Sequence, residues 1–168
     1  MKHSNIFLTK LLPALTLSFI SMMTVNAQGK KDNNGNAVIA NAVETKNYVF
    51  VAQTAQPTSG RQRQLTSSYQ LEVKGDTINA DLPYFGRAYT APVDPSKGGI
   101  NFTSTNFKYT NTPGKKGGWS VLIKPKENID ARQLMLTIST TGYANLQVIS
   151  NNRQSISFSG YVQERKLK

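Results

Sequence analysis

Hydrophobic and polar residues alternate along most of the chain from residue 48 onward. A period of two is typical of β-strands that bury one face and expose the other. The alternation recurs in eight segments, and residues that favour turns separate many of them. These segments are residues 48–52, 65–73, 78–82, 100–109, 119–123, 134–138, 144–148 and 156–158.

The turns between these segments are short. Lys74-Gly75-Asp76, Thr141-Gly142 and Asn151-Asn152 are sequences that form tight hairpin turns. Within residues 100–109 the apolar positions change parity, which predicts a bulge near Thr105-Asn106. The pattern predicts an all-β fold: a single antiparallel β-barrel or sandwich of about eight strands. Before the strands, residues 37–45 carry apolar side chains at helical spacing, which predicts a short N-terminal helix.

The first 27 residues have the three parts of a secretory signal peptide. Lys2 and Lys10 form a basic start, residues 11–25 are uncharged, and Val25-Asn26-Ala27 resembles a signal-peptidase site. The alternative is a membrane anchor, but the uncharged run is shorter than the roughly 20 apolar residues that a spanning helix needs. We therefore expect cleavage between Ala27 and Gln28 and a periplasmic or secreted protein with no transmembrane segment. The expected organisation is a signal peptide (1–27), a flexible tether (28–36), a single β domain (37–164) and a basic tail (165–168).

The residue types that remain after cleavage exclude much of enzyme chemistry. The chain has no Cys, and its one His, His3, lies in the predicted signal peptide. Cysteine nucleophiles, histidine bases and the usual zinc sites are then absent from the mature chain. We expect no enzymatic activity, no cofactor and no metal site. A hydrolase that uses carboxylates alone stays open, although Asp76 and Asp81 lie on opposite faces of one extended segment.

The chain is strongly basic. Its formal net charge of +11 falls by two, to +9, with the loss of Lys2 and Lys10. The basic residues form small clusters in predicted turns and at the C-terminus, which favours solvated loop charges over a single binding surface. An anionic surface polymer is the partner class that this charge leaves open. Export disfavours nucleic acid.

The most unusual segment is the run LPYFGRAY, residues 82–89. In one hypothesis its aromatic residues close the end of the barrel and Arg87 is buried with carbonyl partners. In the other, Tyr84, Arg87 and Tyr89 line a mouth that binds a ligand. Two further side chains are interpreted structurally. Trp119 is expected in the core, with sugar stacking as the alternative, and Arg153 is expected to pair with Asp76 or Asp81.

Four motifs together resemble a known family. They are LPYFGRAY, GGINF (98–102), KKGGW (115–119) and SNNRQSISFSGYV (150–162). In this order they resemble the exported bacterial family catalogued as domain of unknown function 4251, over roughly residues 38–164. The resemblance implies export from a Gram-negative bacterium of the Bacteroides group. It implies no activity and supplies no catalytic residues.

Three function classes stay open from the sequence. The first is a non-enzymatic periplasmic β-barrel that binds a small amphipathic ligand or a protein partner. The second is an envelope-associated module that contacts anionic surface polymers, and the third is the carboxylate-only hydrolase. A continuous apolar cavity inside the barrel would favour the first class. A filled interior with an exposed apolar patch would favour the second.

Overall fold

The structure is a computed structural model that describes residues 33–89, 98–114, 117–127 and 129–165. The predicted signal peptide and the first residues of the tether lie outside this range. The elements are one helix, α1 (Asn33–Glu44), and nine strands. The strands are β1 (Asn47–Pro57), β2 (Arg63–Lys74), β3 (Thr77–Leu82), β4 (Ile100–Ser104), β5 (Phe107–Pro113), β6 (Trp119–Pro125), β7 (Ala131–Ile138), β8 (Tyr143–Ser150) and β9 (Ile156–Glu164).

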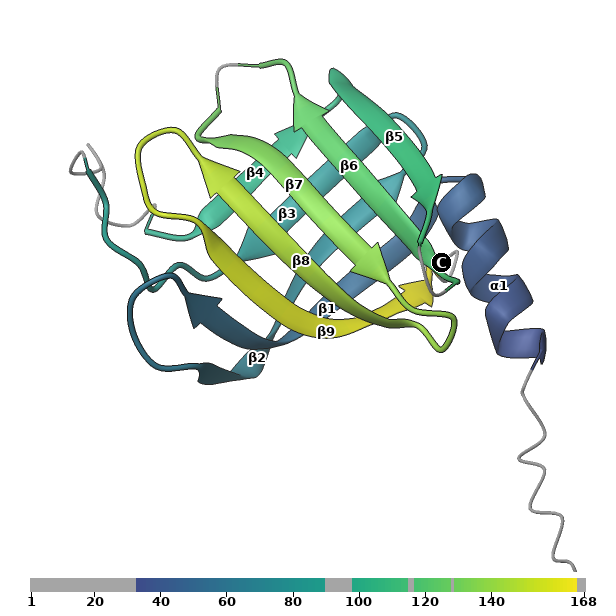
Figure 1. Ribbon diagram of the computed structural model, residues 1–168. Coiled ribbons are helices and arrows are strands. Elements are labelled where there is room, and N and C mark those ends of the chain that lie inside the picture. Colours follow the sequence, from purple (N-terminus) through teal and green to yellow (C-terminus); the bar gives the residue numbers. More distant parts are fainter. Residues whose placement is uncertain (1–32, 90–97, 115–116, 128, 166–168) are drawn as a thin grey trace, which may run out of the picture. The chain divides into compact units, whose positions relative to one another are not determined.

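The strands form one antiparallel sheet that curls into a nearly closed barrel (Figure 1). Their order is β4-β3-β2-β1-β9-β8-β7-β6-β5, so β4 and β5 are the two edges. Neighbours in sequence pair as hairpins, and the pairing of β1 with β9 joins the two halves of the sheet. The all-β barrel that the alternation predicts is therefore confirmed, with nine strands.

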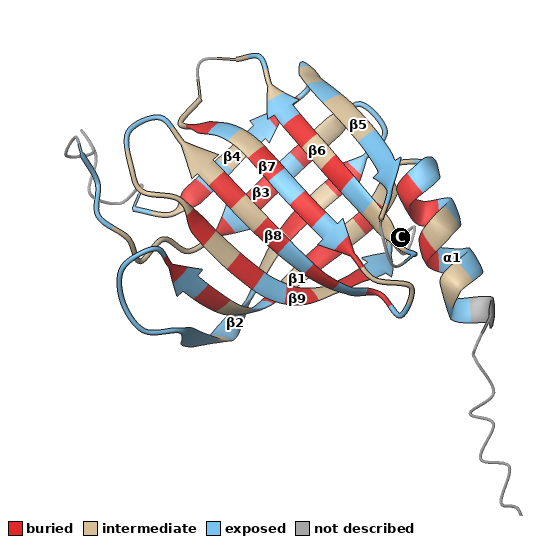
Figure 2. Cartoon of the chain, viewed as in Figure 1, coloured by how far each residue is buried: buried red, intermediate tan, exposed pale blue. Residues whose placement is uncertain are grey.

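Alternation of buried and exposed residues is visible along nearly every strand (Figure 2). The inward-facing side chains join into a single hydrophobic cluster. Burial of these side chains is the main source of stability, since the chain has no disulfide. The largest fully buried side chains are Tyr48, Phe50, Phe158, Leu71, Ile78, Leu82, Ile123, Leu134, Leu136, Ile138, Leu146 and Ile156.

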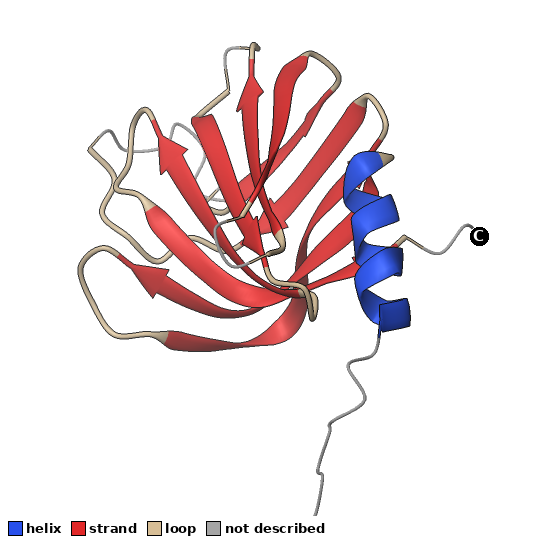
Figure 3. Ribbon diagram, turned by 45° about the vertical axis from the view of Figure 1, so that its right-hand side comes forward, coloured by secondary structure: helices blue, strands red, loops and turns tan. Residues whose placement is uncertain are grey.

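Helix α1 lies against one end of the barrel (Figure 3). It buries Ile39, Ala42 and Val43 in the same hydrophobic cluster. The Tyr109 hydroxyl donates to the Val43 carbonyl at 3.1 Å and lies 3.3 Å from the Tyr48 hydroxyl, which satisfies polar groups at the end of the helix. Helix α1 starts at Asn33, inside the predicted tether and four residues before the predicted helix. No helix in the described ranges is long and apolar enough to span a bilayer.

The structure differs from the sequence analysis at residues 100–109. The parity change there is a two-residue bend at Thr105-Asn106 that separates two strands, β4 and β5, at opposite edges of the sheet, so the prediction of one bulged strand is wrong. The Glu127 carboxylate holds this turn. It accepts hydrogen bonds from the Ser104 hydroxyl at 2.6 Å and from the backbone N–H groups of Thr105 and Asn106 at 3.2 and 2.9 Å. Glu127 thereby joins the β6–β7 loop to the turn between the two edge strands.

This carboxylate should make the fold sensitive to acid. The pKa of Glu127 is lowered from 4.5 to about 2, chiefly because the Ser104 hydroxyl donates to the charged form. A lowered pKa in the folded state stabilises the fold above pH 4.5, and the stabilisation is lost as the pH falls toward 2. We expect Glu127→Gln to lower the thermal midpoint at pH 7, and the gap to the native protein should close between pH 4.5 and 2.

Thermal unfolding followed by circular dichroism across that pH range measures this gap. Glu164→Gln changes an exposed glutamate of β9 and is the matched control, with little expected effect at either pH. A gap between Glu127→Gln and the native protein that stays constant from pH 7 to pH 2 would contradict this role of the carboxylate.

Candidate functional site

The LPYFGRAY segment lies at the end of the barrel opposite to the β7–β8 turn, because it pairs with the β8–β9 connection. Tyr84 and Phe85 are half-buried and pack against the core, whereas Arg87 and Tyr89 are exposed. The Tyr84 hydroxyl lies 2.9 Å from the Arg87 carbonyl and 3.0 Å from the Gln154 carbonyl. Burial raises the pKa of Tyr84 further above neutral, and the protonated hydroxyl is the donor in these contacts. The backbone of this segment is therefore fixed.

Arg87 is exposed, so the hypothesis of a buried Arg87 is wrong. The arginine that donates to backbone carbonyls at this end of the barrel is Arg153. Arg153 donates to the Gly98 and Gly99 carbonyls, both at 3.1 Å, and its guanidinium lies 4.8 Å from the centre of the Tyr84 ring. Its ion-pair partner is Asp130, at 2.5 Å, and not Asp76 or Asp81 as expected. Its side chain is only 15% exposed. Arg153 thus ties three loops together.

A small pocket of about 320 Å³ opens beside Tyr84. Neither Arg87 nor Tyr89 is among the described residues that line it, so the structure does not gather the three predicted ligand residues there. A ligand role for Tyr84, Arg87 and Tyr89 stays a prediction. Asp81 is the one carboxylate in the lining, and no cluster of three metal-binding side chains occurs in the described part of the chain. The described residues of this pocket therefore provide one carboxylate, whereas a carboxylate-only hydrolase needs two.

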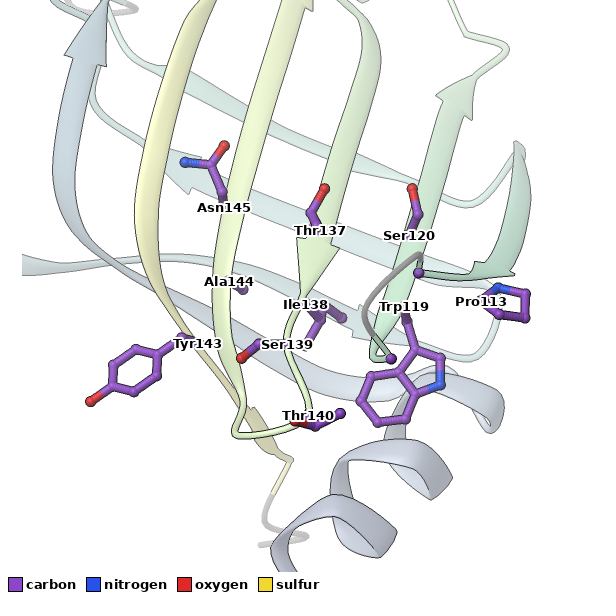
Figure 4. A pocket seen from close by; sticks show the side chains of 12 residues that line it. Pro113, Trp119, Ser120, Thr137, Ile138, Ser139, Thr140, Tyr143, Ala144 and Asn145 are labelled. Atoms are coloured by element: carbon purple, nitrogen blue, oxygen red, sulfur yellow. The ribbon is translucent and has the colours of Figure 1, made fainter.

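A larger groove of about 770 Å³ lies at the opposite end of the barrel, where β6, β7 and β8 line it with residues from both faces of the sheet (Figure 4). Its ends are formed by the β5–β6 connection and the β7–β8 turn. Gly142 takes a positive φ of 87° in that turn, which only glycine adopts without strain. The described lining is Pro113, Gly114, Gly117, Trp119, Ser120, Thr137, Ile138, Ser139, Thr140, Tyr143, Ala144 and Asn145. No residue in this set is charged.

Two aromatic side chains stand at the groove. Trp119 is packed against the core but only partly buried, so the expectation of a core residue holds in part. Tyr143 is 70% exposed, so its ring is open to solvent at the rim of the groove. The groove therefore offers apolar surface to solvent beside polar side chains, a combination typical of small-molecule sites.

The polar side chains of the groove belong to a row that crosses the sheet. Ser120 faces Thr137, and Thr137 faces Asn145, on three adjacent strands, and Figure 4 shows these side chains on one side of the sheet. Thr112 of β5 and Ser159 of β9 extend the row in register. All five side chains are exposed, and the Asn145 amide donates to the Ser159 hydroxyl at 3.1 Å. We call these five residues the polar row.

The fold defines this chain as a nine-stranded antiparallel barrel with one helix across an end. The chain belongs to the family described as a domain of unknown function (DUF4251), which matches residues 30–162. A crystal structure of a DUF4251 family protein from Bacteroides eggerthii DSM 20697 shares the fold, with a TM-score of 0.57 and 15% identity over 78% of this chain and 88% of that chain. No curated protein matches.

Proposed function

We propose that this protein is a non-enzymatic binding module, exported to the periplasm or the medium after cleavage at Ala27, that holds a neutral amphipathic ligand in the surface groove. The observation that carries the proposal is the groove itself. Its volume of about 770 Å³ falls within the range of small-molecule sites, roughly 300–1,000 Å³. Trp119 and Tyr143 supply apolar surface, and the polar row supplies hydrogen-bonding groups.

The position of the groove supports binding at the surface. The inward-facing side chains of the strands pack into one hydrophobic cluster, whereas the groove opens to solvent. The uncharged lining supports a neutral ligand. An anionic ligand would lose its hydration in the groove without a cation among the described lining residues to replace it.

Native mass spectrometry of the protein from its own cells tests this proposal. We expect an intact mass that begins at Gln28 and a non-covalent adduct that survives gentle ionisation. Tyr143→Arg should remove the adduct, because a long charged side chain at the edge of the groove blocks it and favours water over apolar contact. The thermal midpoint should change little, since Tyr143 is exposed.

The matched control is Tyr89→Arg. Tyr89 is 71% exposed and Tyr143 is 70% exposed, but Tyr89 lies at the other end of the barrel. We expect this variant to keep the adduct. Loss of the adduct in Tyr89→Arg and retention in Tyr143→Arg would move the site to the LPYFGRAY segment, and a native protein without any adduct would contradict the proposal.

One observation favours a second candidate, a module that contacts anionic surface polymers. Lys108 of β5 and Lys124 of β6 face each other directly across the strands. Like charges in this position repel, and a polyanion would relieve the repulsion. This candidate takes an anionic ligand at a different place on the sheet, and Tyr143→Arg would leave such binding intact.

A further inference from the structure

The ligand class follows from what lies on either side of the polar row. Along a strand, the next residue on the same face is about 7 Å away. On one side of the row, Tyr143 faces Tyr161 in register. On the other side, Leu122 faces Met135, which is 40% exposed. The outer face of the sheet therefore presents a band of hydroxyl and amide groups between two pairs of apolar side chains.

The chemistry of this band fits a sugar chain. A sugar ring carries hydroxyl groups around its edge and C–H groups on its faces, so it needs hydrogen-bonding partners and apolar contacts side by side. The hydroxyls of Ser120, Thr137 and Ser159 can each donate and accept, and the Asn145 amide can do both as well. The Thr112 hydroxyl already donates to the Ser120 carbonyl at 3.2 Å, so it offers an acceptor. From Thr112 to Asn145 the row crosses three strand spacings, roughly 14 Å at about 4.8 Å each. That length accommodates a short oligosaccharide.

The polar row, unlike the Tyr143, Tyr161 and Met135 side chains beside it, has a composition that protein interfaces disfavour. The centres of protein interfaces are rich in aromatic residues, Met and Arg and poor in Ser, and Ser and Thr seldom dominate their energetics. Four of the five residues in the polar row are Ser or Thr, and none of the five is Arg. The polar row and the two apolar pairs include no basic side chain, although Lys108 and Lys124 face each other in the next row beyond Leu122, so the charged probes below test acidic glycans directly.

We infer that the polar row and the two apolar pairs beside it bind a neutral oligosaccharide. This inference rests on the proposed function, because the groove covers the middle of the row, and it adds the class of ligand. The row would bind the hydroxyl groups of consecutive sugars, and Tyr143 would pack against a ring face.

Affinity electrophoresis of the purified protein against soluble polysaccharides tests the inference. The neutral probes are a β-glucan, an α-mannan, a galactomannan and a xyloglucan, and the charged probes are polygalacturonate and a sulfated dextran. We expect at least one neutral probe to retard the protein. Thr137→Arg, in the middle of the row, should weaken that binding at least tenfold. Thr103→Arg, on an exposed threonine of β4 outside the row, should leave it within twofold.

The outcomes separate this inference from the proposed function. Retardation by no neutral probe, retardation by the charged probes alone, or equal binding by Thr137→Arg and the native protein would overturn the inference. If the adduct seen by native mass spectrometry is lost in Tyr143→Arg but has the mass of a lipid or a peptide, the proposed function stands and the saccharide class is wrong.

Discussion

Gly160→Ala should destabilise the fold by about 3 kcal/mol or more, among the largest effects of any single methyl group added to this chain. Gly160 lies in β9 opposite Ala52, where β1 has a bulge between Ala52 and Thr54. A Cβ atom at Gly160 would lie within 1.9 Å of the Val51 carbonyl oxygen, so the two central strands would have to separate. Overpacking of this kind costs about 1–3 kcal/mol where side chains can move, and a backbone atom cannot move as freely.

Urea unfolding followed by tryptophan fluorescence and circular dichroism measures this cost. The matched control is Gly35→Ala in α1, where an added Cβ meets no atom within 4 Å. Because alanine favours a helix over glycine, the control should be neutral or stabilising by up to about 1 kcal/mol. If Gly160→Ala unfolds within about 1 kcal/mol of the native protein, β1 and β9 are not packed as closely as the structure has them.

Arg153→Met should cost about 2–3 kcal/mol. The change leaves the Gly98 and Gly99 carbonyls and the Asp130 carboxylate without their donor and removes the contact with Tyr84. A hydrogen bond to a charged group contributes about 1.5–3 kcal/mol, and the partial exposure of this pair keeps the total below that of a fully buried one.

Arg87→Met is the matched control for this prediction. Arg87 is exposed, and the same replacement should change the free energy of unfolding by less than about 0.5 kcal/mol. Chemical unfolding of both variants under one set of conditions measures the two losses in the free energy of unfolding. A larger loss in Arg87→Met than in Arg153→Met would contradict the assignment of Arg153 as the arginine that stabilises this end of the barrel.

The strands were predictable because a half-buried strand has apolar residues at every second position, facing the core, and polar residues between them. The β2–β3 hairpin also follows from local sequence, since Gly75 takes a positive φ of 56° in the predicted turn. The β4–β5 turn did not follow. A change of parity has the same sequence pattern in a bulge and in a bend between two strands, and the contacts of Glu127 that stabilise this bend come from a loop more than 20 residues away.

The candidate site was harder to predict, because it depends on register. Ser120, Thr137 and Asn145 are far apart in the sequence, and each alone is an ordinary exposed residue of a strand. Only the pairing of β6, β7 and β8 places them in one row. The exposed position of Tyr143 just after the Thr141-Gly142 turn was a local signal. The aromatic residues of the LPYFGRAY run are close together in the sequence, which suggested a ligand site, yet two of them, Tyr84 and Phe85, pack on the core.

The central claim is that the groove over β6–β8 is the binding surface, and amide chemical-shift mapping tests it most directly. The protein is labelled with ¹⁵N, and the small molecules released by heating natively purified protein are titrated into it. We predict that the largest shifts fall at residues 117–120 and 137–145. Shifts concentrated instead at residues 84–89 and 98–101, at the other end of the barrel, would contradict the account.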